Sequence, residues 1–80
     1  MLPVQCRLAR VAVGWTVLQL AAAAAVTADK VSKFELGRSV GPTTIAAIQR
    51  ALEAEGVVFI AAGESSIGGG PGIRLRGALS

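Results

Sequence analysis

The sequence predicts a mainly α-helical protein, with a bundle of four to five helices followed by a short C-terminal β-hairpin. Apolar residues recur at intervals of three or four from residue 3 to residue 56, which is the period of helices with one buried face. From residue 57 the pattern changes to a short β-branched run and later to strict alternation, as in strands. A chain of 80 residues is long enough for one small domain with a modest core.

The first helix is expected to begin at Pro3, because proline tolerates the first helical position, and to end near Gly14. Its apolar stripe predicts that five side chains face the core: Val4, Leu8, Val11, Ala12 and Trp15. Three polar residues lie off this stripe: Gln5, Arg7 and Arg10. Trp15 is the single tryptophan, and we expect it to be a core anchor where two helices meet.

Two shorter helices are expected to follow, over residues 17–24 and 28–36. Thr16 and Gln19 have the spacing of a capping box at the start of the first, and Thr27 is a suitable N-cap for the second. Their spacing predicts four inward-facing side chains: Leu20, Ala24, Val31 and Phe34. Gly37 is the residue type that ends a helix in the left-handed conformation.

Gly41-Pro42 marks the start of a fourth helix, which carries the stripe Ile45, Ile48 and Leu52 and closes at Gly56. Beyond it, residues 57–60 and 73–76 are expected to pair as an antiparallel hairpin across a flexible loop at 61–72. The predicted organisation is a helix-turn-helix domain over 3–56, a hairpin extension over 57–76 and a disordered tail over 77–80.

Residues 16–38 have the features that a helix-turn-helix requires. Ala21 is small where two helices cross, Ala25-Val26 can form a tight turn, and Val31 and Phe34 anchor the second helix. In this motif the second helix enters the major groove of DNA. Residues 1–50 carry six basic and two acidic groups, a net charge of +4, whereas residues 51–80 carry two basic and three acidic groups. The basic excess therefore lies with the motif, and DNA is the leading candidate for the partner.

Several motifs then occur in order along the chain: Gln5-Cys6-Arg7-Leu8-Ala9-Arg10, Gly14-Trp15-Thr16, Leu20-Ala21, Phe34-Glu35-Leu36-Gly37-Arg38, the stretch 47–60 and the stretch 68–76. On these motifs the chain resembles the Cro/phage-repressor type of helix-turn-helix regulator, the XRE family, and in particular a short bacterial branch with a Gly-Gly-Gly-Pro-Gly tail. The resemblance implies a λ-repressor-like domain and a sequence-specific transcriptional regulator. We therefore expect a cytoplasmic homodimer that binds double-stranded DNA, with no cofactor and no catalysis.

The resemblance also implies a set of DNA-facing residues: Thr16, Val17, Thr27, Ala28, Asp29, Lys30, Ser32, Lys33 and Arg38. Lys33 and Ser32 are expected to read bases, while Lys30 and Arg38 are expected to hold phosphates. The chain departs from the family pattern at several of these positions and in the turn. Val17 stands where glutamine is common, and Ala25 stands where glycine is usual. Ala28 offers only a methyl group, and Asp29 could accept from a cytosine amino group.

Two other functions stay open. Arg7 and Arg10 precede an almost uncharged run that ends in Val26-Thr27-Ala28, which is the outline of a signal sequence over residues 1–28. The product would then be an exported peptide. Alternatively, the helix-turn-helix serves as a protein-interaction module with a possible protein partner. The run 11–28 is a poor membrane span because it is rich in alanine and contains polar residues, so no membrane partner is expected.

Composition weighs against several kinds of site. Histidine is absent and Cys6 is the single cysteine, so an intramolecular disulfide, a zinc site and a Ser-His-Asp triad all lack their residues. The glycine-rich stretch 67–72 lacks the Lys-Ser/Thr of a phosphate-binding loop. Neither a catalytic residue nor a metal ligand is therefore expected.

Overall fold

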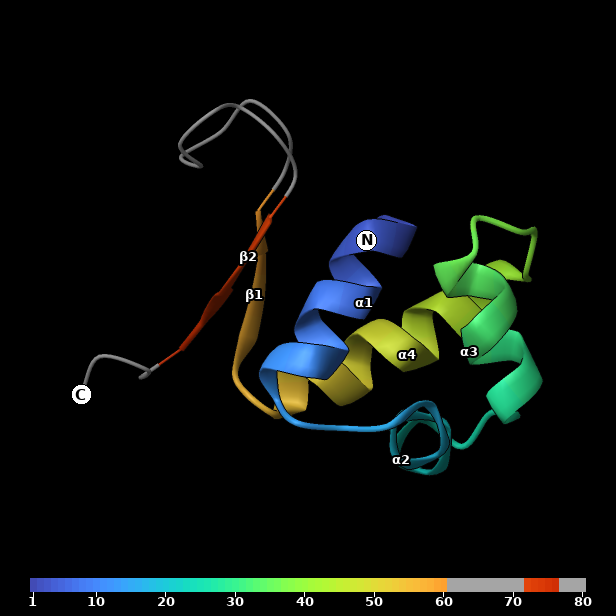
Figure 1. Ribbon diagram of the computed structural model, residues 1–80, viewed down its shortest axis with the longest axis horizontal. Helices are drawn as coiled ribbons and strands as arrows, with labels where there is room; N and C mark the ends of the chain where they lie inside the picture. Colours follow the sequence, from blue (N-terminus) through green and yellow to red (C-terminus); the bar gives the residue numbers. More distant parts are fainter. Residues whose placement is uncertain (61–71, 77–80) are drawn as a thin grey trace.

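A computed structural model of the chain describes residues 1–60 and 72–76. Its elements are, in order, α1 (Pro3–Ala12), α2 (Val17–Ala24), α3 (Ala28–Glu35), α4 (Pro42–Ala54), β1 (Val57–Ile60) and β2 (Gly72–Leu75) (Figure 1). The described part is thus mainly helical, with an antiparallel pair of strands, and the coarse fold class is confirmed. Most of the predicted loop 61–72 and all of the predicted tail 77–80 lie outside the described residues.

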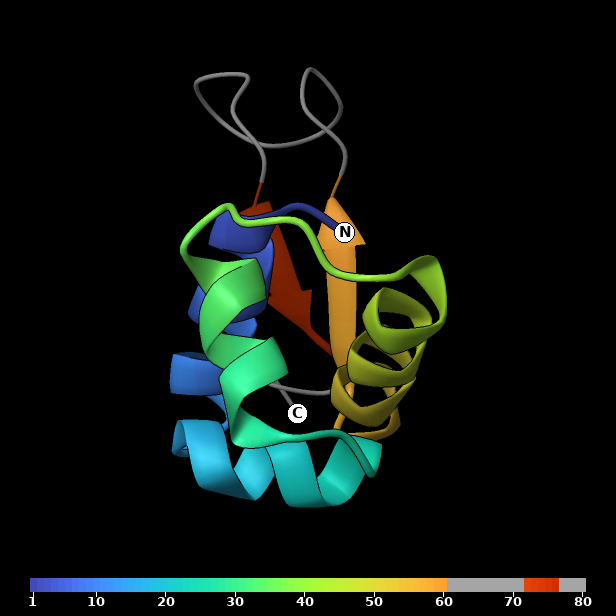
Figure 2. The same cartoon turned by 90° about the vertical axis from the view of Figure 1, so that its right-hand side faces the viewer.

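The four helices surround a common interior, and the hairpin closes one side of it. In Figure 2, α1 and α3 lie on one side and α4 on the other, while α2 crosses beneath them and the strands lie behind. The hydrophobic residues buried between these elements are Cys6, Ala9, Leu20, Ala21, Val31, Phe34, Ile48, Leu52 and Val57. Because Val57 belongs to β1, the helices and the hairpin share one core.

The orientation of α1 differs from the one that its apolar stripe predicts. Gln5, Cys6 and Ala9 are its buried residues, whereas Val4, Leu8 and Val11 are 48%, 44% and 63% exposed, and Ala12 is exposed as well. Trp15 is half-buried against the core. The inward prediction for the stripe is therefore wrong. The small side chains of Cys6 and Ala9 allow α1 to lie close to the other helices, which bulkier residues at these positions would prevent.

Gln5 can be buried because the hairpin satisfies its amide. Its Nε2 donates to the carbonyl oxygens of Ile60 at 2.7 Å and Gly72 at 3.0 Å, and its Oε1 accepts from the Leu2 N–H at 2.8 Å. A buried amide without such partners would be costly, so these bonds determine which side of α1 faces inward. They also join α1 to the paired ends of β1 and β2, where Ile60 lies opposite Gly72.

Three helices end in the same hydrogen-bonded reversal, with a left-handed residue just beyond the last turn. These residues are Gly14, Ala25 and Gly37, at φ 77°, 57° and 81°. In each case the next N–H reaches back five residues: Trp15 to the Arg10 carbonyl, Val26 to that of Ala21 and Arg38 to that of Lys33, at 2.9 to 3.0 Å. This is the Schellman arrangement, in which carbonyls at a helix end are satisfied while the chain reverses sharply.

Ala25→Gly is expected to raise the free energy of unfolding by roughly 0.5–1 kcal/mol. Ala25 is the one non-glycine with a positive φ within residues 1–60 and 72–76, and its Cβ is strained in that conformation, whereas glycine has none. Urea unfolding followed by Trp15 fluorescence measures the change.

The matched control is Ala22→Gly, the same substitution at an exposed position within α2. There it should lower the free energy of unfolding by about 1 kcal/mol, because glycine is a poor residue in a helix interior. Destabilisation by both substitutions would contradict the strain assigned to Ala25.

Candidate nucleic-acid interface

The candidate interface is built on α2, the turn at Ala25-Val26 and α3. Figure 2 shows α2 crossing the lower end of α3 at a steep angle. Both helices begin at a threonine cap. Thr16 Oγ1 accepts from the Gln19 N–H at 3.1 Å, and Gln19 Oε1 accepts from the Thr16 N–H at 2.8 Å, which confirms the predicted capping box. Thr27 Oγ1 accepts from the Lys30 N–H at 3.3 Å. These caps hold the N-terminal turns of the two helices in place.

The predicted contact residues differ in exposure. Six of them are exposed: Thr16, Thr27, Asp29, Lys30, Lys33 and Arg38. Three are half-buried: Val17, Ala28 and Ser32. Val17 and Ala28 pack against the core, so part of each side chain serves to seat its helix. The charged contact candidates therefore lie at the surface, while the two apolar candidates also contribute to the packing of their helices.

Asp29 and Lys33 are paired with each other on α3. Lys33 Nζ lies 3.1 Å from Asp29 Oδ2, one turn away, and the two side chains remain 72% (Asp29) and 48% (Lys33) exposed. An exposed pair of this kind contributes little to stability. Its main effect is on charge, because the carboxylate neutralises the lysine that was expected to read bases. In the described part of the chain, Lys30 and Arg38 take part in no such ion pair.

Ser32 faces a different direction from Lys33. It lines a depression of about 280 Å³ between α1 and α3, together with Arg7, Arg10, Glu35 and Leu36. The structure thus gathers Asp29 and Lys33 into one exposed pair and separates Ser32 from them. Ser32 and Lys33, the two residues that were expected to read bases, therefore lie on different sides of α3.

Sequence reasoning missed the ion pair beside this depression. Arg10 Nε donates to Glu35 Oε2 at 2.8 Å, and Nη2 donates to Oε1 at 3.1 Å. The remaining nitrogen, Nη1, donates to the Trp15 carbonyl at 3.0 Å. The Arg10 and Glu35 side chains are only 15% and 9% exposed. The partners are 25 residues apart, so no local spacing could have indicated the contact.

Cys6 lies against the same carboxylate, with Sγ 3.6 Å from Glu35 Oε2. Burial, with the negative charge of Glu35 beside it, raises the pKa of the Cys6 thiol to about 12. The hydrogen bonding of Arg10 to the Glu35 carboxylate raises the pKa of Arg10. This cluster therefore favours a neutral thiol next to a charged pair, which is an environment for a structural cysteine and not for a nucleophile.

Two further findings concern the described residues as a whole. They contain no group of three or more His, Cys, Asp or Glu side chains that could hold a metal ion. Their longest helix, α4, has 13 residues, and none of the helices has the length and apolar character needed to cross a membrane.

The chain matches no protein-family model, and no curated protein matches it.

Proposed function

We propose that α2, the Ala25-Val26 turn and α3 form a λ-repressor-like helix-turn-helix, and that the chain is a DNA-binding transcriptional regulator. The observation that carries this proposal is the exposed, polar side of α3, which bears Asp29, Lys30 and Lys33. The opposite side, through Val31 and Phe34, is buried in the core to which α2 also contributes. The major groove is wide enough for such a helix. As expected from the sequence, the chain would act in the cytoplasm as a homodimer, with its two copies bound to the two halves of a two-fold symmetric DNA site.

Within this proposal the exposed residues have distinct roles. Lys33 reads a base edge, while Lys30 and Arg38 contact phosphates on either side of the groove. Asp29 is 72% exposed in its side chain and holds Lys33 at 3.1 Å, so it competes with DNA for that lysine. Its carboxylate also repels phosphate, and Asp29 therefore weakens the complex.

Removing the competing carboxylate should strengthen DNA binding, and removing the lysine should weaken it. Asp29→Asn is expected to tighten binding roughly 3- to 10-fold, because it releases Lys33 and removes a negative charge near phosphate. Lys33→Ala is expected to weaken binding and relax sequence preference, whereas Arg38→Ala should weaken all sequences alike and lower the salt slope by about 1. The measurement is anisotropy titration, over a range of salt concentrations, on duplexes selected from a random pool.

Arg50→Ala is the matched control, since Arg50 is an exposed arginine on α4, outside the proposed interface. It should leave affinity nearly unchanged. If Arg50→Ala and Arg38→Ala lower the affinity for DNA equally, the protein binds DNA only through nonspecific charge attraction. If the random pool yields no enriched sequence, the DNA-binding proposal is wrong.

The export interpretation requires residues 1–28 to be removed. That segment supplies Cys6, Ala9, Leu20 and Ala21 to the core, so the remaining chain would lose four buried members of the cluster that contains Val31 and Ile48. The intact mass of the native protein distinguishes the two functions.

A further inference from the structure

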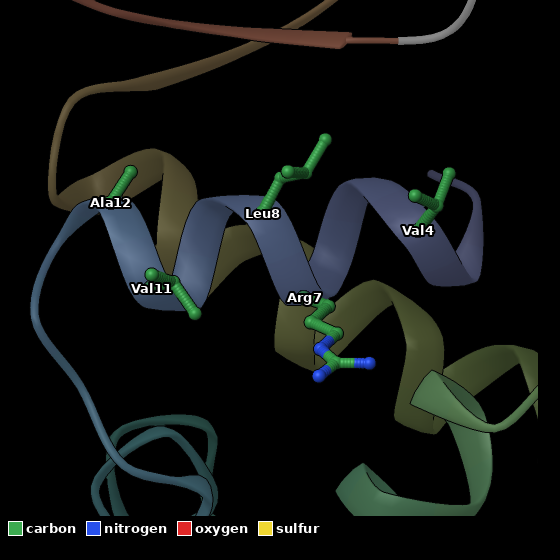
Figure 3. A pocket seen from close by; sticks show the side chains of 5 residues that line it. All are labelled: Val4, Arg7, Leu8, Val11 and Ala12. Carbon is green, nitrogen blue, oxygen red and sulfur yellow. The ribbon is translucent and has the colours of Figure 1, made fainter.

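The outer face of α1 is apolar and has no partner among the described residues. It carries Val4, Leu8 and Val11, which succeed one another at intervals of four and three and are 48%, 44% and 63% exposed. With Arg7 and Ala12 they line a depression of about 280 Å³ (Figure 3). Intervals of four and three place side chains on one face of a helix, which is the pattern of a face that packs against another element. Here only the opposite side, through Gln5, Cys6 and Ala9, is occupied.

Arg7 joins this depression to the one between α1 and α3. It lines both, and the second also contains Leu36, which is 72% exposed. The apolar residues of α1 and Leu36 therefore lie on either side of one exposed guanidinium. Arg10, the other arginine nearby, is already occupied by Glu35 through two hydrogen bonds. Arg7 takes part in no hydrogen bond or ion pair of its side chain within residues 1–60 and 72–76, so it is the charge available to a ligand.

We propose that the outer face of α1 docks an amphipathic, acidic α-helix of a partner protein. Apolar side chains of that helix would cover Val4, Leu8 and Val11, whose spacing suits helix-against-helix packing. A carboxylate beside them would pair with Arg7, whose guanidinium can donate two parallel hydrogen bonds to it. The inference goes beyond DNA binding, because it assigns a separate surface on α1 to a separate partner.

Charge complementarity favours this partner over a second copy of the chain. A two-fold contact between two α1 helices brings the same patch together from both sides. With Leu8 at the centre, the two Arg7 side chains would lie within one turn of the axis and repel each other. Glu35, the carboxylate that lines the neighbouring depression together with Arg7, is engaged by Arg10 and would not compensate them. An acidic helix of a partner protein would instead place a carboxylate beside Arg7, so no repulsion between arginines arises.

The test uses the full chain and a designed, fluorescein-labelled helical peptide with a leucine stripe flanked by glutamates. Its counterpart has the same leucines with lysines in place of the glutamates. The glutamate peptide is expected to bind in the micromolar range, and the lysine peptide about 10-fold or more weakly, as loss of one charge-assisted pair implies. Leu8→Asp should abolish binding of the glutamate peptide. Arg7→Glu should reverse the preference between the peptides, which a general loss of structure would not do.

Leu18→Asp is the matched control, since Leu18 is a 72% exposed leucine on α2, away from this surface. It should leave peptide binding unchanged, and circular dichroism checks that each variant is folded. Equal binding of both peptides, or binding of neither, would overturn the proposal. It would also be overturned if Leu8→Asp instead dissociates a dimer in sedimentation, or releases the chain from phosphatidylserine vesicles. Those results would assign the face to a second copy or to a lipid surface.

Discussion

Cys6 is expected to react with thiol reagents at least about 100-fold more slowly in the folded protein than in concentrated urea, because modification must await unfolding. Its side chain is fully buried, and the raised pKa, about 12, keeps it protonated near neutral pH. The thiolate is the reactive form, so both burial and protonation protect it. Labelling with a chromogenic disulfide near neutral pH, with and without urea, measures the ratio.

The same thiol should make the protein less stable in alkaline solution. In the unfolded chain Cys6 has a pKa near the ordinary value of 9.0, whereas in the folded chain it is raised to about 12. Below pH 9 both states keep the proton, and the full stabilisation is present. Between these two values only the unfolded state releases the proton. The free energy of unfolding should therefore fall with rising pH, at a limiting slope of about 1.4 kcal/mol per pH unit.

Urea unfolding between pH 8 and about pH 10 tests this slope, and the sequence contains no tyrosine that would add a second proton release there. Cys6→Ala is the control, and its stability should be nearly constant over the same range. Similar labelling rates in the folded and unfolded protein would contradict the buried position of the thiol. An equally steep slope in Cys6→Ala would show that another group causes the pH dependence.

Glu35→Ala is expected to lower the free energy of unfolding by about 3 kcal/mol, a large part of the stability of a small domain. The substitution leaves Arg10 charged, only 15% exposed in its side chain and without the two hydrogen bonds that it donates to Glu35. It also removes a contact between α1 and α3. Urea unfolding followed by Trp15 fluorescence measures the loss.

Two comparisons distinguish the loss of the Arg10–Glu35 ion pair from the general effect of replacing a glutamate with alanine. Glu53→Ala removes an exposed carboxylate of α4 that accepts from Gln49 at 3.1 Å, and it should change stability by less than about 0.5 kcal/mol. The double substitution Arg10→Met with Glu35→Leu should recover most of the loss, because no unpaired charge remains. If Glu35→Ala and Glu53→Ala have equal effects, the ion pair does not stabilise the fold.

Features that depend on neighbouring residues could be predicted from the sequence. Pro3 begins α1, Thr16 and Gln19 cap α2, and Gly37 follows α3 in the left-handed conformation, as expected. These interactions span three to five residues, so the sequence pattern contains both partners. The alternation Ile73-Arg74-Leu75 likewise predicted a strand with one side packed on the core, which is confirmed.

Features that depend on distant residues could not be predicted. The helical spacing of α1 is compatible with two inward faces, one through Leu8 and one through Cys6 and Ala9. Its own residues favour the face through Leu8, because the apolar stripe is the more hydrophobic of the two. The choice depends on Gln5 meeting the carbonyls of β1 and β2, which lie 55 and 67 residues away.

The candidate nucleic-acid interface likewise has some features that depend on neighbouring residues and others that depend on distant ones. By itself, the sequence determined two short helices with a reversal at Ala25 and an exposed, polar start to α3, because helix caps and turns are local. The Asp29–Lys33 pair is local too, since it spans one turn of α3. Only the tertiary structure decided that Ser32 turns toward the depression lined by Arg7, and that the apolar side of α1 is left uncovered. Those outcomes follow from how the helices pack against one another, since packing determines which side chains come within reach of each other.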